Sequence, residues 1–385
     1  MGRELNNRAI WYPESDAQKT GEEYKKSMYY HLTEGAFKQF VDLVKKSESD
    51  DSIPELMLCF RSNQDSVTIY YNNHIVWDLS INKRGPKVSI SANHARYSDN
   101  WIGILSSIGM DRNKLEEREK KLKEEKKVIK IDKFSRSADK LPEDYAKKTI
   151  HKLIGMINDF FNVDKKWDFF ENRKAIKAYD RIHKIYIEGK RNLVEKKRQQ
   201  EYYLNNRSFC GGYFVYDMEF QHEYGNDTEK KTDFRYMGIN KANQTDCLAI
   251  RYDDKGKPIK LAFVEIKSIK DSMTDSEEDG SGLRAHMINM DKYITKHLDY
   301  MKLRLKEAQD ILTLYNKLGL RGVSKDMCEA DLSKLELFGN QEIVLVYTDS
   351  AREYIETENG KKWRDKTLAG FPTKEGAYNI VQILR

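Results

Sequence analysis

The spacing of apolar residues changes several times along the chain, and each change marks a predicted element. Residues 22–46 repeat apolar side chains at the spacing of a helix with one buried face. Three following stretches, 56–62, 67–81 and 87–94, are rich in apolar and β-branched residues and are separated by short polar turns. They predict a small antiparallel sheet that ends near Trp101 and is covered by the preceding helix.

Helical patterns dominate the middle of the chain. Between residues 111 and 130, acidic and basic residues are interleaved at helical spacing, which predicts a solvated helix stabilised by ion pairs. Pro142 and Glu143 stand where a first helical turn begins, so residues 142–162 predict a second helix. One or two further helices are expected over residues 166–206.

Strand patterns return in the last half of the chain. Residues 211–222 alternate between large apolar and polar side chains, and residues 245–252 and 261–269 form two apolar runs joined by a turn rich in Asp, Gly and Pro. A long helical pattern at 283–318 precedes another apolar run at 342–350. This order of strands, helix and strand predicts a sheet flanked by helices.

The changes of pattern predict an α/β chain, α+β overall, in three parts. Residues 1–110 are expected to form a small α+β module for recognition, regulation or assembly. Residues 111–190 form a charged helical connector, and residues 191–385 form a domain built on a mixed sheet.

Composition and charge narrow the class of protein. The 385 residues include 34% charged residues, but the net charge is only +6, which is compatible with nucleic-acid binding without indicating a basic patch. The four cysteines lie far apart and favour free thiols in a reducing compartment over a disulfide framework or a zinc site. Because the N-terminus lacks a signal-peptide core and no run reaches about 18 apolar residues, we expect a cytoplasmic protein without a membrane span.

Aromatic residues of the predicted N-terminal sheet have two interpretations. These residues are Tyr70, Tyr71, Trp77, Tyr97 and Trp101. Such rings stack on bases in nucleic-acid-binding proteins, but they more often belong to a core or an interface. The second interpretation is favoured, because nothing in the sequence places the rings together on one open face.

Two acids and one lysine stand out in the predicted hairpin. Glu265 and Lys267 are two positions apart on a strand, so their side chains project from the same face, with Cα atoms about 6.6 Å apart. Asp246 begins the partner strand, and the hairpin brings it beside Glu265. Burying such charges among apolar neighbours is costly unless they pair or hold a metal ion. The alternative is an edge strand that carries one exposed ion pair.

Asp246, Glu265 and Lys267 match the signature of the PD-(D/E)XK nuclease superfamily, and the last half of the chain resembles that family. Thr245 stands where the proline in the family's name is found. The resemblance implies the restriction-endonuclease-like fold and Mg²⁺-dependent hydrolysis of phosphodiester bonds, with Mn²⁺ able to substitute. It further implies that Asp246, Glu265 and the main-chain carbonyl of Ile266 bind the metal, while Lys267 orients or helps to deprotonate the attacking water.

Members of this family often add a carboxylate from the first helix or the first strand of the domain. Alternation along residues 211–222 places large apolar residues on one face and acidic or amide residues on the other: Phe214, Tyr216, Met218 and Phe220 against Asp217, Glu219 and Gln221. Glu219 is the candidate ligand of a second metal ion, with Glu195 and Glu201 as alternatives on the preceding helix. The competing interpretation is the exposed face of an edge strand.

The favoured function is an Mg²⁺-dependent nuclease, an endonuclease with DNA preferred over RNA as substrate. It is expected to act as a homodimer or with a protein partner bound through the N-terminal half. Three alternatives stay open. They are an inert nucleic-acid-binding protein on a nuclease-like fold, a regulated effector of bacterial antiviral defence or genome maintenance, and a structural protein that assembles through its mixed-charge helices.

Overall fold

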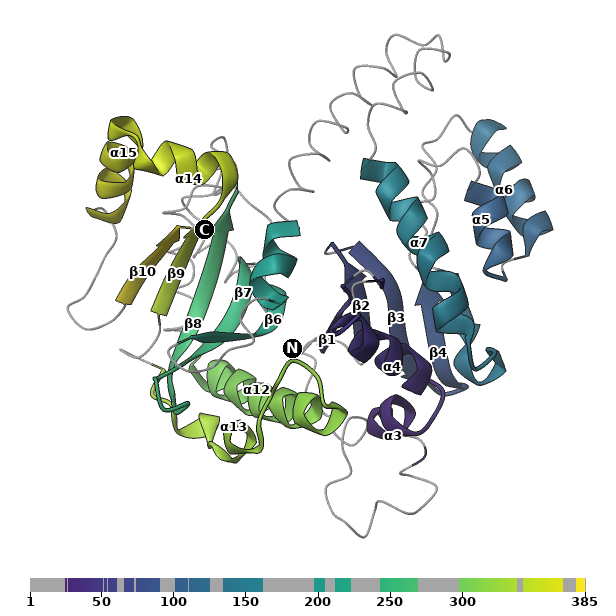
Figure 1. Ribbon diagram of the computed structural model, residues 1–385, viewed down its shortest axis with the longest axis horizontal. Helices are drawn as coiled ribbons and strands as arrows, with labels where there is room; N and C mark the ends of the chain where they lie inside the picture. The colour runs from purple at the N-terminus through teal and green to yellow at the C-terminus, as the bar shows by residue number, and fades with distance from the viewer. Residues whose placement is uncertain are drawn as a thin grey trace, which may run out of the picture. The chain divides into compact units, whose positions relative to one another are not determined.

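The computed structural model divides the chain into two compact units (Figure 1). It describes residues 25, 27–50, 52–53, 55–60, 66–72, 74–90, 101–109, 111–124, 134–161, 197–204, 212–222, 243–268, 298–337, 342–369 and 379–384. Of these residues, 25–161 belong to the N-terminal unit and 197–384 to the C-terminal unit.

The N-terminal unit contains an antiparallel sheet in which each strand pairs with the next along the chain. Its strands are β1 (Met57–Phe60), β2 (Ser66–Tyr71), β3 (His74–Asn82), β4 (Gly85–Ile90) and β5 (Phe134–Ser137). The apolar run at 67–81 is split into two strands by a reversal at Asn72, which adopts a left-handed φ of 47°. Asn tolerates this conformation better than most residues. The predicted antiparallel sheet is therefore confirmed.

Two helices of the N-terminal unit pack together and cover the sheet. Helix α4 (Lys38–Ser47) contacts β1, and helix α7 (Tyr145–Phe161) contacts β3. Phe40 of α4 meets Trp77 of β3 with ring centroids 5.1 Å apart. The other helices in the described part of this unit are α3 (Met28–Thr33), α5 (Trp101–Ser107), α6 (Arg112–Glu124) and the short 3-10 helix η3 (Ala138–Lys140).

Burial decides between the two interpretations of the N-terminal aromatic residues where their side chains are described. Trp77 is fully buried and Tyr70 is 2% exposed, so both rings belong to the core and are unable to stack on bases. Tyr71 is partly buried. Tyr97 and the side chain of Trp101 lie outside the described residues.

The N-terminal unit extends past the boundary predicted at residue 110. Strand β5 and helix α7 lie in the predicted connector, yet β5 pairs with β4, with Phe134 opposite Ile90, and α7 packs on β3. Trp101 begins helix α5 instead of ending the sheet. Within the same stretch, α6 has the expected ion-paired character, because Arg112 Nε lies 2.7 Å from Glu116 Oε1 one helical turn away.

The C-terminal unit is built on a mixed sheet. Its strands are β6 (Tyr213–His222), β7 (Asn243–Tyr252), β8 (Pro258–Lys267), β9 (Glu342–Tyr347) and β10 (Asn379–Leu384). Their order in the sheet is β10-β9-β8-β7-β6. Strands β6, β7 and β8 pair in antiparallel fashion, whereas β9 and β10 run parallel to β8. Strand β8 therefore lies at the centre of the described sheet, with two strands on each side.

The turn between β7 and β8 is fixed by side-chain chemistry. The Asp253 carboxylate accepts hydrogen bonds from the backbone N–H groups of Lys255 at 2.9 Å and Lys257 at 2.8 Å. Gly256 adopts a φ of 78°, which is accessible to glycine at little cost. The predicted hairpin that brings Asp246 back beside Glu265 is confirmed.

A β-bulge in β6 overturns the simple alternation expected for that strand. The pairing with β7 shifts between Val215 and Asp217, so one extra residue is inserted there. As a result, Phe214 and Asp217 both meet the same helix, α12 (Leu298–Leu318): Phe214 contacts Tyr315, and Asp217 pairs with Arg304. The two residues had been expected on opposite faces.

Helices cover the C-terminal sheet and supply buried polar contacts. Arg304 of α12 is fully buried and binds Asp217 of β6 and Glu307 Oε2, the latter at 2.5 Å. On β9, buried side chains pack against helix α14 (Asp349–Glu356), which follows that strand directly. The other helices described are 197–204, α13 (Lys325–Glu329), the 3-10 helix η5 (Leu332–Lys334) and α15 (Glu358–Ala369).

The chain is thus a mixed α/β protein, α+β overall, with two separate sheets in its described part. Among the described residues no helix is both long and apolar enough to cross a lipid bilayer.

Candidate functional site

Three acidic residues occupy one row across neighbouring strands β6, β7 and β8. Cys247 of β7 pairs with Met218 on one side and with Val264 on the other. The next position along each strand is Glu219, Asp246 and Glu265, respectively. The backbone of Asp246 therefore lies between those of the other two acids. The side chain of Glu219 lies outside the described part of the structure.

Both oxygens of the Asp246 carboxylate accept hydrogen bonds. Oδ2 accepts from the backbone N–H of Ile266 at 2.6 Å, and Oδ1 accepts from the side-chain amide of Gln199 at 2.7 Å. Asp246 is 8% exposed. A buried carboxylate held by two donors is fixed in orientation, which is the arrangement that a metal ligand or a structural buried acid requires.

Glu265 and Lys267 form a buried ion pair on β8. Lys267 Nζ lies 2.7 Å from Glu265 Oε1, and the two residues are 6% and 2% exposed. Because β8 is central in the described sheet, the alternative of an exposed pair on an edge strand is wrong. Lys267 is also held by the residue that follows β9, since its carbonyl accepts a hydrogen bond from Thr348 N at 2.9 Å. The three predicted residues therefore meet on two adjacent strands.

The donor set around Asp246 fits a hard cation. In an antiparallel ladder a residue directs its N–H and C=O toward the same neighbouring strand. The Ile266 N–H points at Asp246, so the Ile266 carbonyl also faces the β7 side of β8. Carboxylate and carbonyl oxygens are the ligands that Mg²⁺ prefers. Within the described residues, however, no group of three or more His, Cys, Asp or Glu side chains is arranged to hold a metal ion.

A tyrosine hydroxyl lies beside the ion pair. Tyr347 of β9 is opposite Lys267 in the parallel register and is fully buried. Burial raises the pKa of Tyr347 to about 12, while the charges of Arg364 and Lys267 act in the opposite direction. No described residue hydrogen-bonds the Tyr347 hydroxyl. The site therefore contains a buried phenol whose proton is retained at neutral pH.

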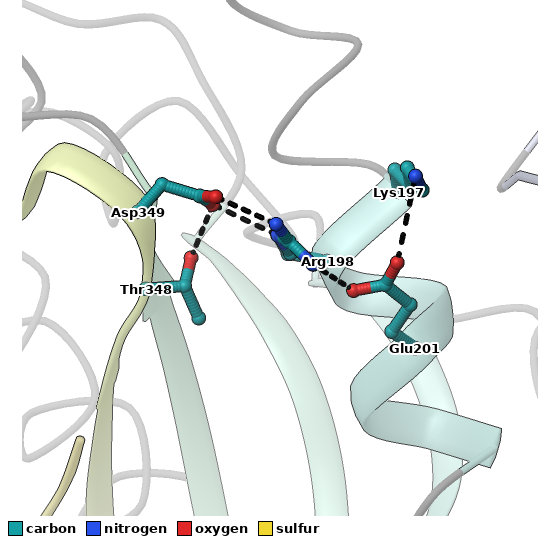
Figure 2. A network of polar contacts seen from close by, with 5 residues as sticks. All are labelled: Lys197, Arg198, Glu201, Thr348 and Asp349. Atoms are coloured by element: carbon teal, nitrogen blue, oxygen red, sulfur yellow. Dashed lines mark hydrogen bonds and ion pairs between the residues drawn. The ribbon is translucent and has the colours of Figure 1, made fainter. Parts of the chain in front are cut away.

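A second polar network ties helix 197–204 to the end of β9 (Figure 2). Arg198 donates two hydrogen bonds to Asp349, from Nε to Oδ2 at 2.8 Å and from Nη2 to Oδ1 at 2.6 Å. Thr348 Oγ1 donates to the same carboxylate at 2.9 Å. Hydrogen bonding from Arg198 is the main cause that lowers the pKa of Asp349, and Asp349 adopts a left-handed φ of 49°. Backbone strain of this kind persists only where neighbouring contacts hold it.

The two alternatives to Glu219 that were predicted on the preceding helix, Glu195 and Glu201, differ in what the structure shows of them. Glu201 binds Arg198 and lies 3.8 Å from Lys197 Nζ, so its carboxylate belongs to the network at Asp349 (Figure 2). Glu195 lies outside the described residues. From this helix it is the side chain of Gln199 that reaches Asp246, and Gln199 was not among the predicted site residues. The available signal was a glutamine on the helix face that also carries the buried Tyr202 and Tyr203.

Comparisons with protein-family models, with curated proteins and with solved structures return no match to this chain. The resemblance to the PD-(D/E)XK superfamily therefore depends on the residues themselves and on where the strands place them.

Proposed function

We propose that the protein is a metal-dependent phosphodiesterase that hydrolyses nucleic acid, with cleavage of internal bonds in DNA favoured. The observation that carries the proposal is the convergence of Asp246, Glu265 and Lys267 on adjacent buried strands. Charged side chains are costly in such a setting. Their clustering is easier to understand as a site for chemistry than as support for the fold.

The arrangement of elements supports the same proposal. A hairpin that carries the acids, a following long helix and further strands parallel to β8 agree with the order expected of a restriction-endonuclease-like domain. We assign that fold to the C-terminal unit as part of the proposal. The N-terminal unit has its own sheet, and we assign it to substrate recognition, to regulation or to assembly with a partner or a second copy of the chain.

In this mechanism Asp246, Glu265 and the carbonyl of Ile266 would hold Mg²⁺, and Glu219 would supply a further carboxylate. When bound, the ion would activate water and offset negative charge on the phosphate. The Lys267 ammonium lies 2.7 Å from Glu265 Oε1, and in this mechanism it would orient the attacking water and stabilise the negative charge that develops. Gln199 and Ile266 N–H fix the Asp246 carboxylate.

One observation favours a second candidate, an inert protein that binds nucleic acid or assembles with partners. Every described charge at the site already has a protein partner: Asp246 has Gln199 and Ile266, and Glu265 has Lys267. The three charged residues are also at most 8% exposed. A closed, buried network of this kind also serves a purely structural role.

Cleavage in defined metals separates the two candidates. The protein is incubated with plasmid, linear DNA and RNA in Mg²⁺, Mn²⁺, Ca²⁺ or EDTA. Cleavage in Mg²⁺ and Mn²⁺ that EDTA abolishes supports the nuclease. The Asp246→Asn and Glu265→Gln variants should then lose it.

Glu342→Gln is the matched control for that experiment. Glu342 is a fully buried glutamate of the same sheet and lies 2.9 Å from Arg251, so its replacement disturbs a similar pair outside the site. The control should cut at the wild-type rate. Binding of nucleic acid without cleavage in any metal supports the inert candidate instead.

A further inference from the structure

Gln199 connects helix 197–204 to the strand that carries Asp246. Its side chain is 4% exposed and donates to Asp246 Oδ1 at 2.7 Å, while Ile266 N donates to Oδ2 at 2.6 Å. One donor on the helix and one on β8 therefore define the plane of this carboxylate. A change in the helix position would rotate it.

The helix that carries Gln199 is held near both of its ends. Arg198, in its first turn, forms the two-bonded ion pair with Asp349 at the end of β9 (Figure 2). Near the other end, the carbonyl of Tyr203 accepts from Arg321 at 2.8 Å, and the Arg321 guanidinium carbon lies 3.7 Å from the centre of the Tyr203 ring. Gln199 is thus presented on a rigid support, as the orientation of a ligand requires.

A neutral amide at this place has a different chemical effect from a carboxylate, the group considered on this helix in the alternatives Glu195 and Glu201. Two carboxylates in hydrogen-bond contact do not both ionise readily, because like charges raise the pKa of one of them. An amide donates a hydrogen bond to ionised Asp246 without this repulsion.

We propose that Gln199 is a positioning residue of the active site, which orients the Asp246 carboxylate for metal binding through its side-chain N–H. The inference rests on the proposed nuclease function. Residues that hydrogen-bond a ligating carboxylate typically change metal affinity or activity by about 10–100-fold when they are replaced. Gln199 is expected to act in this range, with no contact of its own to the nucleic acid.

Three variants of the full chain test the inference. Gln199→Met keeps the volume but removes the donor, and Gln199→Glu keeps the shape but replaces the amide with an acid. Gln200→Met is the control, because Gln200 is also 4% exposed and lies about 100° further around the same helix. Mn²⁺ affinity is measured by calorimetry without substrate, Mg²⁺-dependent cleavage is measured as kcat and KM, and folding is checked by thermal melting.

Gln199→Met should lower Mn²⁺ affinity and kcat about 10–100-fold while the KM for nucleic acid is retained, and Gln200→Met should change neither. Gln199→Glu keeps the shape of the side chain but lacks the N–H donor, so it should also change Mn²⁺ affinity and kcat relative to wild type. A role limited to packing changes neither.

Each outcome decides a specific point. Wild-type affinity and rate in Gln199→Met, or an equal loss in Gln200→Met, overturns the role of Gln199 and leaves the nuclease function standing. A wild-type protein that binds no Mn²⁺ and cuts no substrate overturns the proposed function and this inference with it. If Gln199→Met does not fold, wild-type Mn²⁺ affinity and kcat in Gln199→Glu overturn the inference.

Discussion

Replacing Lys267 by Met tests the proposed chemistry most directly. Methionine keeps much of the lysine stem and removes the ammonium that lies 2.7 Å from Glu265 Oε1. Because both residues are almost fully buried, the pair belongs to the class of buried salt bridges. Breaking such a pair by removing one partner costs about 3–5 kcal/mol, since the other charge is left uncompensated.

This stability cost has a measurable size. For a unit of about 200 residues, each kcal/mol lowers the melting temperature by roughly 2–4 °C, so Lys267→Met should melt about 6–20 °C below wild type. If Lys267 also stabilises charge in the transition state, kcat should fall about 10²–10³-fold. Substrate binding should be largely intact, because that charge acts mainly after binding.

Arg251→Met separates the two effects. Arg251 pairs with the fully buried Glu342 at 2.9 Å on the same sheet, so its replacement also leaves a buried glutamate without its arginine partner. Cleavage is compared well below the melting temperature of both variants, with the folded fraction fixed by circular dichroism. We expect both variants to lose stability and only Lys267→Met to lose kcat. Equal cleavage by Lys267→Met and wild type refutes the catalytic assignment, and equal losses in both variants show that only stability is being measured.

Three further predictions concern the surroundings of the site. Arg321→Met should lower the free energy of unfolding, measured in urea, by about 2–4 kcal/mol. The reason is that Arg321 donates hydrogen bonds to the carbonyls of Val215 and Tyr203 and stacks on three aromatic rings. A loss below about 0.5 kcal/mol contradicts this prediction. Asp349→Asn should lower the stability of the protein by about 1 kcal/mol or less above pH ~4, because the ion pair of Asp349 with Arg198 is partly exposed. This difference from wild type should vanish as the pH falls below ~3.9 and passes the lowered pKa of Asp349. A difference that does not shrink as the pH falls below ~3.9 shows that the ion pair is not its cause. Tyr347→Phe should leave stability unchanged or raise it by about 1 kcal/mol, since no described group accepts a hydrogen bond from this hydroxyl. A fall in kcat at unchanged stability would instead indicate that the hydroxyl contacts the substrate.

The strands that the sequence predicted well are those whose burial is uniform. Cys247 to Ile250 and Leu261 to Val264 are all buried, because β7 and β8 lie inside the described sheet. Apolar runs of this kind, joined by a turn that contains Asp253 and Gly256, predict a hairpin from a short stretch of sequence. The meeting of Asp246 with Glu265 follows from that hairpin alone. This part of the site was therefore accessible to local reasoning.

Features that depend on pairing across long distances were not accessible in the same way. The bulge after Val215 changes which side chains of β6 share a face. The alternation of apolar and polar residues along that strand does not predict it. Strand β5 has the sequence FSRS, which is short and mostly polar, and it is a strand because it pairs with β4, where Ser135 and Ser89 hydroxyls lie 2.8 Å apart. Tertiary pairing outweighs local preference in both cases.

The same distinction explains why Glu201 was weighed as a ligand and Gln199 was not. A helical pattern gives the spacing of its residues but not the rotation of the helix against a sheet. Here the rotation is fixed by partners distant in sequence: Asp349, 151 residues from Arg198, and Arg321, which holds Tyr203. Those contacts direct Glu201 to Arg198 and Gln199 to Asp246. A carboxylate that already pairs with a neighbouring arginine is a poorer metal ligand than its charge suggests, whereas the buried Gln199 amide donates a hydrogen bond to the acid that lies beside it.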